Sequence, residues 1–430
     1  MNVADQFHIA AGLVAAMRSQ WWSAEKIRKH QEAALVRIMR HAVAQVPFYR
    51  RLDLPAAAIG SAADLRRFPV IGKRDVQRQP EAFIADGFAT PELHASRTSG
   101  SSGRPTTTYF DRNAWLLGKY ILKMRRVAAT CGLPLMRRVM IVSEQPPERL
   151  AAAASDGPSG LGVFFRRRYL SIHTPVKDHL IELARYRPHM IYAFPSYLLD
   201  LVTTAERCNV QLPKLDVLYT SSEVLTVAAR IRIETAFAGR VYDVYGSTEF
   251  KEVAWQCHAG RHHLNFENVY VEPQDPGSCA PVILTSLRND AMPLLRFDIG
   301  DRAVFGFEVC PCGRRSPHMV EIAGREGDMI TLPSGRRLSP YLLTTAIESE
   351  ESILQYRIVQ TETNAFRIDA VVRSPGQSAR WQGPLCAELM RRAAEPVGFM
   401  VREVDHLVRA PGGKRSVFVR HTPVPADPDL

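Results

Sequence analysis

The sequence has no apolar run close to the ~20 residues that a helix needs to cross a bilayer. One apolar stretch near the N-terminus, Ile9–Met17, is short and follows Asp5 with no basic segment before it, which is unlike a secretory signal peptide. Internal repeats and low-complexity tracts are missing as well. We therefore predict a cytoplasmic protein with no membrane contact, and in that compartment its seven cysteines are not expected to form disulfides.

A concentrated patch of positive charge is also missing, although the formal net charge is +11. Arginine and lysine residues are dispersed along the chain, and the basic run is Arg166, Arg167 and Arg168. A nucleic-acid-binding protein usually concentrates its charge and adds stacking aromatic rings. The dispersed charge therefore favours a small phosphorylated ligand over nucleic acid. A basic, zinc-stapled nucleic-acid-binding protein is the alternative from another class.

The chain lacks the Walker P-loop, which needs G-x-x-x-x-G-K-[ST]. Its nearest equivalent is Ser96–Thr108, S-R-T-S-G-S-S-G-R-P-T-T-T, where Gly100 and Gly103 are too close together and Thr106 replaces the lysine. Hydroxyls, backbone N–H groups and the Arg104 guanidinium suit phosphate oxygens. Glycine lets the backbone approach a ligand closely. The segment predicts a phosphate-binding loop, and a flexible Ser/Gly linker is the alternative.

The apolar pattern predicts an α/β protein of two domains. A helix is expected at Ala24–Gln45, capped by Ser23 and ended by Pro47. After it, strands alternate with helices, which favours a mainly parallel sheet covered by helices. The expected strands are Arg138–Ser143, Met190–Phe194, Asp216–Thr220, Arg240–Tyr245 and Pro281–Leu287, and the expected helices are Lys177–Tyr186, Ser196–Cys208 and Ala228–Phe237.

The pattern of expected strands and helices changes near Gly324–Asp328. Beyond this point we expect strands at Gln355–Gln360 and Ala365–Val372 joined by a turn at residues 363–364, a helix at Ser378–Ala394, and a strand at Val401–Val408. These elements predict a small α+β domain at residues 327–430. Residues 1–326 are expected to form the large N-terminal domain, with covered mixed sheets and helices.

A polar segment, Asp243–Glu249, follows one of the expected strands. It reads D-V-Y-G-S-T-E and is expected to precede a helix. Ligands of α/β proteins bind at the carboxyl ends of strands. Glu249 offers the carboxylate that Mg²⁺ takes alongside phosphate oxygens. The alternative is a helix N-cap at Ser247 or Thr248, with Glu249 favoured by the helix dipole.

Three further polar segments lie downstream. Leu294–Asp301, L-L-R-F-D-I-G-D, places an acid suited to ribose hydroxyls at a strand end. Ala323–Ile330, A-G-R-E-G-D-M-I, lies where the pattern of expected strands and helices changes, at the boundary of the small domain. Arg409–Arg415, R-A-P-G-G-K-R, places a lysine in a glycine-rich turn of the small domain, from which it can be carried into another site.

These motifs, in this order, resemble those of the adenylate-forming superfamily, which contains acyl-CoA synthetases, nonribosomal adenylation domains and luciferases. They are T-S-G-S-S-G-R-P-T, Y-G-S-T-E, R-F-D-I-G-D, G-R-E-G-D and G-G-K-R, and they span residues 97–415. The short length, V-P-F-Y-R at Val46–Arg50, F-P-V-I-G-K-R-D-V at Phe68–Val76 and Thr106 resemble the phenylacetate–coenzyme A ligase branch.

The resemblance implies activation of a carboxylic acid by ATP and Mg²⁺ as acyl-AMP, followed by transfer to a thiol. It implies a catalytic set of Lys414, Thr248 and Glu249, in which Glu249 holds Mg²⁺ and Asp328 is the hinge. The residues implied in nucleotide binding are Thr98, Ser99, Gly100, Ser101, Ser102, Gly103 and Thr106 for the phosphates, Ser222, Glu223, Tyr245 and Gly246 for the base, and Asp301 with Arg325 for the ribose.

The identity of the acid stays open, with an aryl or arylacetic acid expected from the branch and a medium aliphatic acid as the alternative. By family analogy its pocket is lined by Phe194–Ser196, Tyr219–Ser222 and Val244–Gly246. Coenzyme A is the expected acceptor, and a carrier-protein phosphopantetheine or an amine is the alternative. Whether the chain forms a homodimer is open. A second alternative is an inactive binding protein of the same fold.

A separate group of soft ligands predicts a structural zinc site. Cys257 and His263 lie in C-H-A-G-R-H-H, and Cys310 and Cys312 lie in C-P-C-G. Two pairs of ligands beside glycines suit a Cys₃His site, and some members of the resembled branch carry one. Either His262 or His258 can replace His263. The alternative is free cysteines at a turn beside an incidental histidine cluster.

Overall fold

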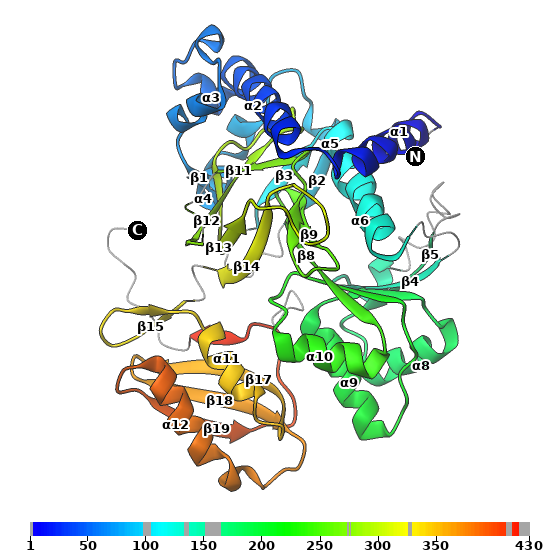
Figure 1. The fold of residues 1–430 in the computed structure, drawn as a ribbon, viewed down its shortest axis with the longest axis vertical. Coiled ribbons are helices and arrows are strands. Elements are labelled where there is room, and N and C mark those ends of the chain that lie inside the picture. The colour runs from blue at the N-terminus through cyan, green and yellow to red at the C-terminus, as the bar shows by residue number, and fades with distance from the viewer. Residues whose placement is uncertain are drawn as a thin grey trace.

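The structure is a computed structural model that describes residues 3–97, 105–132, 137–150, 165–272, 275, 277–325, 329–409 and 415–420. One large mixed sheet runs through the centre of the molecule, and a smaller sheet lies below it in the view of Figure 1. Within these described ranges, no helix combines the length and the apolar character needed to cross a membrane.

Twelve described strands form the large sheet. One half is parallel, as predicted, and the other half is antiparallel from β9 onward. In spatial order the strands are β11 (Val269–Val271), β12 (Cys279–Ser286), β13 (Phe297–Gly306), β14 (His318–Arg325), β10 (His262–Leu264), β9 (Lys251–Gln256), β8 (Arg240–Ser247), β7 (Val217–Ser221), β6 (Met190–Ala193), β4 (Arg137–Ser143) and β5 (Phe165–Ser171), with β1 (Ile71–Gly72) beside β13. The predicted strand near Pro281 is therefore antiparallel to its neighbour β13.

Helices cover the parallel half because their apolar faces match its continuous hydrophobic strands. The helices α8 (Val176–Tyr186), α9 (Pro195–Cys208) and α10 (Val227–Phe237) confirm the three predicted helices to within a residue or two. Three further helices follow one another beside β9, namely α5 (Arg112–Leu116), the π-helix η5 (Leu117–Ile121) and α6 (Leu122–Cys131). The apolar core of α9 and α10 includes Leu198, Leu201 and Phe237.

Three N-terminal helices pack on the antiparallel half, namely α2 (Ala24–Gln45), α3 (Pro47–Arg50) and α4 (Lys73–Arg78). The first helix, α1 (Val3–Ser19), packs instead against η5 and α6. The predicted bounds of α2 are confirmed: the Ser23 hydroxyl accepts a hydrogen bond of 3.2 Å from the Lys26 N–H, and Pro47 follows its end. Short 3₁₀ helices lie at Ala56–Ala58, Ala62–Arg67, Pro80–Phe83 and Thr90–Glu92. The strands β2 (His94–Arg97) and β3 (Thr107–Phe110) form a separate two-stranded ribbon.

The small sheet has the order β19 (Gly398–Glu403), β18 (Ala365–Val372), β17 (Ile353–Glu362) and β20 (Phe418–Arg420), and β15 (Ile330–Thr331) pairs with β16 (Arg337–Leu338). The hairpin of β17 and β18 confirms the predicted turn, since Glu362 pairs with Ala365. The predicted helix is shorter: α12 spans Gln382–Ala393 after a 3₁₀ turn at Ser378–Arg380, and α11 (Tyr341–Glu348) packs beside it. The last predicted strand ends earlier, because β19 pairs with β18 only as far as Glu403.

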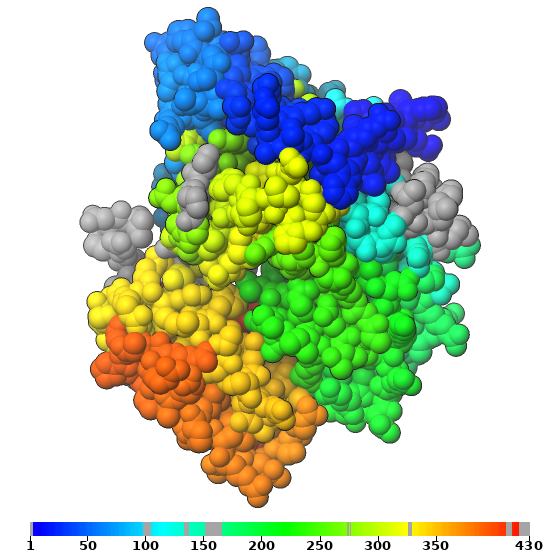
Figure 2. Space-filling model, in the orientation of Figure 1, coloured from blue at the N-terminus to red at the C-terminus, as the bar shows by residue number. Residues whose placement is uncertain are grey.

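The small sheet and its helices form a lobe that packs against α9 and α10 of the large sheet. Figure 2 shows this lobe, in yellow and orange, against the green part of the chain, with a hollow where the colours meet. The lobe has its own apolar core, which includes Ile358, Phe366, Ile368 and Leu389.

Candidate active site

Three predicted nucleotide residues meet beside the carboxyl end of β8. The Tyr245 hydroxyl donates a hydrogen bond of 2.7 Å to Oδ2 of Asp301 on β13. Asp301 pairs in register with Arg325 on β14, and the Arg325 Nε lies 3.5 Å from Oδ1 of Asp301. Burial raises the pKa of Asp301, and the Tyr245 hydrogen bond and the Arg325 charge offset part of that effect. Side chains from β8 and β14 thus fix the orientation of one acid on β13.

Thr248 and Glu249 occupy the turn that joins β8 to β9, where Ser247 pairs with Lys251. The helix predicted after Glu249 is wrong: a strand follows, so the N-cap interpretation of this motif fails as well. Glu249 is a buried residue, 8 % exposed, at the tip of this hairpin. A Cβ at Gly246 would overlap the carbonyl oxygen of Lys251, which explains why the hairpin needs glycine there.

The Glu223 carboxylate is held by three donors at the end of β7. It accepts hydrogen bonds from the Ser196 N–H at 3.0 Å, the Ser196 hydroxyl at 2.9 Å and the Arg415 N–H at 2.6 Å. Burial raises the pKa of Glu223, while these donors favour its ionised form. Glu223, which was predicted to lie beside the base, therefore also contacts the small lobe through Arg415.

A cavity of about 330 Å³ opens beside Ser222, which has a left-handed backbone (φ 71°). Its walls come from the ends of three parallel strands, the edge at which α/β proteins bind ligands. Tyr192 and Phe194 supply aromatic surface, and Ser143 and Gln145 supply polar atoms. This cavity includes Phe194 and Ser221–Ser222 from the predicted acid pocket, whereas Pro195, Tyr219 and residues 244–246 do not line it.

The predicted phosphate segment lies partly outside the described residues. Thr98, Ser99, Gly100, Ser101, Ser102 and Gly103 fall in that part, as do Asp328 and Lys414. Thr106 is buried, and its hydroxyl accepts a hydrogen bond of 2.9 Å from Gln77 on α4. Arg97 pairs with Thr107, so the segment joins two paired strands of one ribbon. Paired strands at both ends favour the binding-loop interpretation over the flexible Ser/Gly linker.

A lysine cluster was not predicted from the sequence. The Nζ atoms of Lys119 and Lys251 lie 4.6 and 4.7 Å from the centre of the Trp115 ring. Burial, followed by the charges of Lys123 and Lys119, lowers the pKa of Lys251 to about 7. The sequence does not reveal the cluster, because Lys251 is far from the other two lysines along the chain. Lys251 comes from the β8–β9 hairpin, whereas Lys119 comes from η5 and Lys123 from α6.

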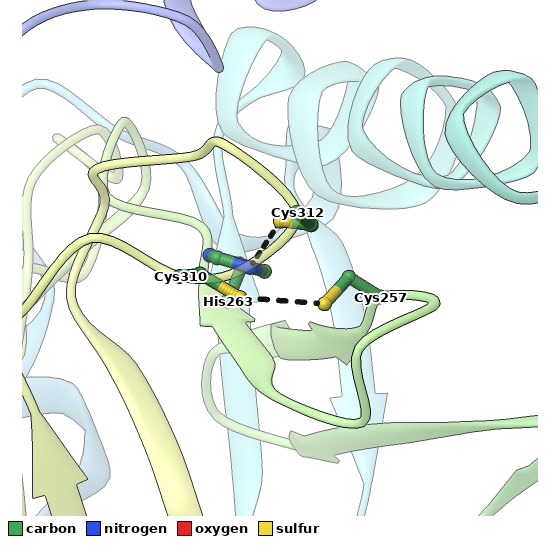
Figure 3. A group of neighbouring side chains, drawn as sticks. All are labelled: Cys257, His263, Cys310 and Cys312. Carbon is green, nitrogen blue, oxygen red and sulfur yellow. Dashed lines mark hydrogen bonds between the residues drawn. The ribbon is translucent and has the colours of Figure 1, made fainter.

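Four soft ligands converge beside β10 (Figure 3). The ligand atoms of Cys257, His263, Cys310 and Cys312 all lie within 4.8 Å of one another. The Cys257 and Cys310 sulfurs are 3.8 Å apart, and the Cys312 sulfur is 3.2 Å from Nε2 of His263. Two ligands come from the β9–β10 hairpin and two from the loop between β13 and β14.

The geometry of this group fits zinc. With Zn–S bonds of about 2.3 Å in a tetrahedron, two sulfurs lie about 3.8 Å apart. Gly260 and Gly313 have positive φ, and their N–H groups bond to the Cys257 and Cys310 carbonyls at 2.9 and 2.8 Å, so both cysteine pairs sit on tight turns. Ser316 lies 2.9 Å from Nδ1 of His263, which leaves Nε2 facing the sulfurs.

The structure favours His263 over the two alternative histidines as the metal ligand. His262 contacts Asp243 through Nε2 at 3.1 Å, and His258 is exposed. Burial, followed by the Arg314 guanidinium, lowers the pKa of His263 to about 3, so its ring is neutral near pH 7. A neutral imidazole is the form that binds metal.

Comparison with known proteins agrees with the motif order. The chain is 27% identical over 364 residues to a phenylacetate–coenzyme A ligase from Thermus thermophilus, covering 78% of each protein. Among solved structures, 2-hydroxyisobutyryl-CoA ligase in its postadenylation state with 2-HIB-AMP gives a TM-score of 0.78 at 20% identity, covering 94% of this chain and 91% of that one.

The same ligase in its thioesterification state, with 2-HIB-AMP and CoA, gives a TM-score of 0.62 at 18% identity, covering 94% and 92% of the two chains. No family model matches the chain. The similarity to the curated relatives and the shared fold confirm the resemblance seen in the motifs. The chain is a homologue of the phenylacetate–coenzyme A ligases and shares the fold of the solved CoA ligases.

Proposed function

We propose that this chain is an AMP-forming acid–thiol ligase. It attaches a carboxylic acid to the α-phosphate of ATP, releases pyrophosphate, and transfers the acyl group to the thiol of coenzyme A with release of AMP. The observation that carries the proposal is the meeting of Tyr245, Asp301 and Arg325 beside the Thr248–Glu249 hairpin. The curated relatives are named as coenzyme A ligases and one solved neighbour holds CoA, which favours coenzyme A over a carrier protein as the acceptor.

The chemistry needs no general base, because a carboxylic acid is already ionised at pH 7. The barrier is instead the approach of one anion to another. Catalysis is therefore electrostatic and positional, which suits cations and backbone donors. Lys414 bridges the attacking carboxylate and the α-phosphate. Thr248 donates to the same phosphate.

Magnesium suits the Glu249 hairpin. Mg²⁺ takes one or two carboxylates together with phosphate oxygens, and Glu249 presents one carboxylate at the strand edge where ligands bind. When bound there, the ion neutralises charge on the polyphosphate.

Asp301 holds the ribose. A carboxylate accepts hydrogen bonds from two hydroxyls, and the contacts from Tyr245 and Arg325 fix its plane. Tyr245 also packs near the adenine, with Ser222 and Glu223 beside the base. The phosphate loop at residues 98–106 holds the β- and γ-phosphates.

The acid is proposed to be an aryl or arylacetic acid. The cavity of about 330 Å³ beside Ser222 has the volume for one aromatic ring and a short chain, and Tyr192 and Phe194 line it. Further aromatic surface lies nearby, where the Arg126 guanidinium stacks 4.1 Å from the centre of the Tyr219 ring.

A structural zinc ion is proposed at Cys257, His263, Cys310 and Cys312. Four protein ligands leave no open position, so the ion staples two loops and takes no part in the reaction. The small lobe, residues 327–430, is proposed to be a mobile domain that carries Lys414.

Pyrophosphate exchange tests the function. Wild-type protein with ATP, Mg²⁺ and labelled pyrophosphate is expected to exchange label only when a suitable carboxylic acid is present. A panel of phenylacetic, benzoic, anthranilic and medium aliphatic acids identifies the acid class. Coenzyme A, phosphopantetheine and simple amines are then compared as acceptors. Failure of every acid to support exchange contradicts the proposal and favours the inactive binding protein.

A further inference from the structure

One carboxylate on α9 binds two arginines of the small lobe. Both oxygens of Asp200 lie 2.9 Å from Nη2 of Arg415, and the Arg409 guanidinium also donates to Asp200. In the same place Gln355, on β17, donates a hydrogen bond of 2.8 Å to Asp200. We call these four residues the Asp200 cluster. Figure 1 shows α9 and α10 beside β17, where this contact lies.

A second carboxylate holds the backbone next to this cluster. Glu223 accepts the Arg415 N–H at 2.6 Å, and Nη1 of Arg409 donates to the Ser196 hydroxyl at 3.0 Å. Ser196 in turn donates to Glu223. Two carboxylates and two guanidinium groups therefore balance in charge across the contact between the large sheet and the small lobe.

The two arginines stand on either side of the lysine that the proposed reaction needs. Residues 410–414 lie between them, outside the described residues, and include Lys414. Asp200 binds both Arg409 and Arg415, so the large sheet holds the described residue on each side of the proposed catalytic lysine.

The contact is shielded from water, so its charges interact strongly. The exposed fractions of the side chains are 14% for Asp200, 9% for Arg415 and 17% for Arg409. Removing one partner from such a buried pair leaves the others without compensation. Gln355 also contacts Thr203, so Ser196, Asp200 and Thr203 form a polar stripe on successive turns of α9 that faces the small lobe.

From these contacts we infer that Asp200 is a positioning residue for adenylation. It holds Arg409 and Arg415 of the small lobe against α9 in the arrangement proposed for adenylation, and it has to release both arginines before the lobe can take another position for thioester formation. The inference rests on the proposed function. The arrangement that contains these contacts is the one that superposes better on the postadenylation state of the solved ligase than on its thioesterification state.

The test compares the two half-reactions in Asp200→Asn. The first is measured as pyrophosphate exchange with the best acid of the panel, and the second as conversion of its preformed acyl-AMP by coenzyme A. We expect exchange to fall by about 10- to 100-fold, the range that a misplaced catalytic group produces, and thioester formation to stay near the wild-type rate. Asp200→Glu, which keeps the charge, is expected to recover part of the exchange.

The matched control is Arg232→Met. Arg232, on α10, donates to the Leu354 carbonyl of the same lobe at 2.6 Å but contacts neither Arg409 nor Arg415 in the described hydrogen bonds. It is expected to change exchange much less than Asp200→Asn. An equal loss in both variants overturns the inference, because general docking of the lobe would then account for the effect.

Further outcomes separate the possibilities. If Asp200→Asn does not fold, Arg409→Gln removes one contact to the same carboxylate and is expected to show a smaller loss of exchange alone. Equal slowing of both half-reactions, or no change in exchange, in the folded variant overturns the inference. If the wild-type protein and Asp200→Asn show the same rate of pyrophosphate exchange, this inference alone is refuted. If the wild-type protein shows no pyrophosphate exchange, the proposed function is refuted.

Discussion

The Tyr245 hydroxyl donates its hydrogen bond to Asp301 across two strands that are separated by more than fifty residues of sequence. The bond leaves Oδ1 of Asp301 facing Arg325, so the tyrosine sets the plane of the acid. A carboxylate fixed in this way suits the paired hydroxyls of a ribose. The pair ties the adenine side of the proposed site to its ribose side.

Tyr245→Phe is expected to raise the KM for ATP by about 3- to 10-fold, the usual effect of losing one hydrogen bond. The turnover number should change less, because the hydroxyl does not touch the reacting atoms. Steady-state kinetics with varied ATP measures both constants. Tyr186→Phe is the matched control, since the Tyr186 hydroxyl bonds to the Arg166 carbonyl far from the site. An unchanged KM in Tyr245→Phe contradicts the role.

The KM for ATP is also expected to rise in acid. Burial raises the pKa of Asp301 above its usual value, and protonation removes an acceptor for the ribose hydroxyls. Affinity is therefore full above this pKa and falls as the pH drops through it. Because the Tyr245 hydrogen bond lowers the same pKa, Tyr245→Phe should move the rise in KM to higher pH. A shift to lower pH would contradict the assignment.

Zinc removal is expected to destabilise the protein without abolishing the chemistry. Metal analysis of purified protein should give about one equivalent of zinc, as four closed ligands imply. Cys310→Ser should lose the metal and lower the melting temperature, whereas Cys208→Ser, at an exposed thiol, should do neither. Less than half an equivalent of zinc in the wild-type protein rules the site out.

Lys251 is expected to make the stability of the fold depend on pH. Its pKa falls from an ordinary value near 10.5 to about 7, so between these values the unfolded chain binds a proton that the folded chain does not. The free energy of unfolding should therefore rise with pH between about 7 and 10. Lys251→Met should weaken this rise, as urea titrations at two pH values would measure. The same slope in both proteins contradicts the shifted pKa.

Lys414→Ala is expected to slow adenylation by about 10²- to 10³-fold, because it removes a cation from a desolvated transition state. The thioester step should suffer much less, since the proposed domain motion carries the lysine away. Stopped assays of each half-reaction measure the two rates. Equal loss in both would show that Lys414 does not have this role.

Much of the fold was predictable because local patterns decide it. The parallel strands and their helices follow from apolar runs of strand length alternating with amphipathic segments, and α2 carries its own cap and stop at Ser23 and Pro47. The Glu249 hairpin was mispredicted for a physical reason. A hydroxyl followed by an acid after a strand suits a helix N-cap and a tight turn equally well, and pairing of Ser247 with Lys251 decides between them.

The site was predictable where a motif carries it and not where tertiary contacts do. The strand register that pairs Asp301 with Arg325 joins two recognised motifs. The contact of Asp200 with Arg409 joins residues more than two hundred positions apart, and nothing local marks it. A polar stripe at Ser196, Asp200 and Thr203 on an otherwise apolar helix was the available signal. The choice of His263 over His262 likewise required the strand pairing that turns the two rings apart.

The central claim is that a carboxylate oxygen attacks the α-phosphate of ATP, and its most direct test follows that oxygen. The wild-type protein is given ATP, Mg²⁺, coenzyme A and an accepted acid labelled with a heavy oxygen isotope in its carboxylate. Mass spectrometry of the products should find one labelled oxygen in AMP and none in pyrophosphate, because the bond that breaks on thiol attack leaves the acid's oxygen on phosphorus. Label in inorganic phosphate, or AMP without label, would contradict the account.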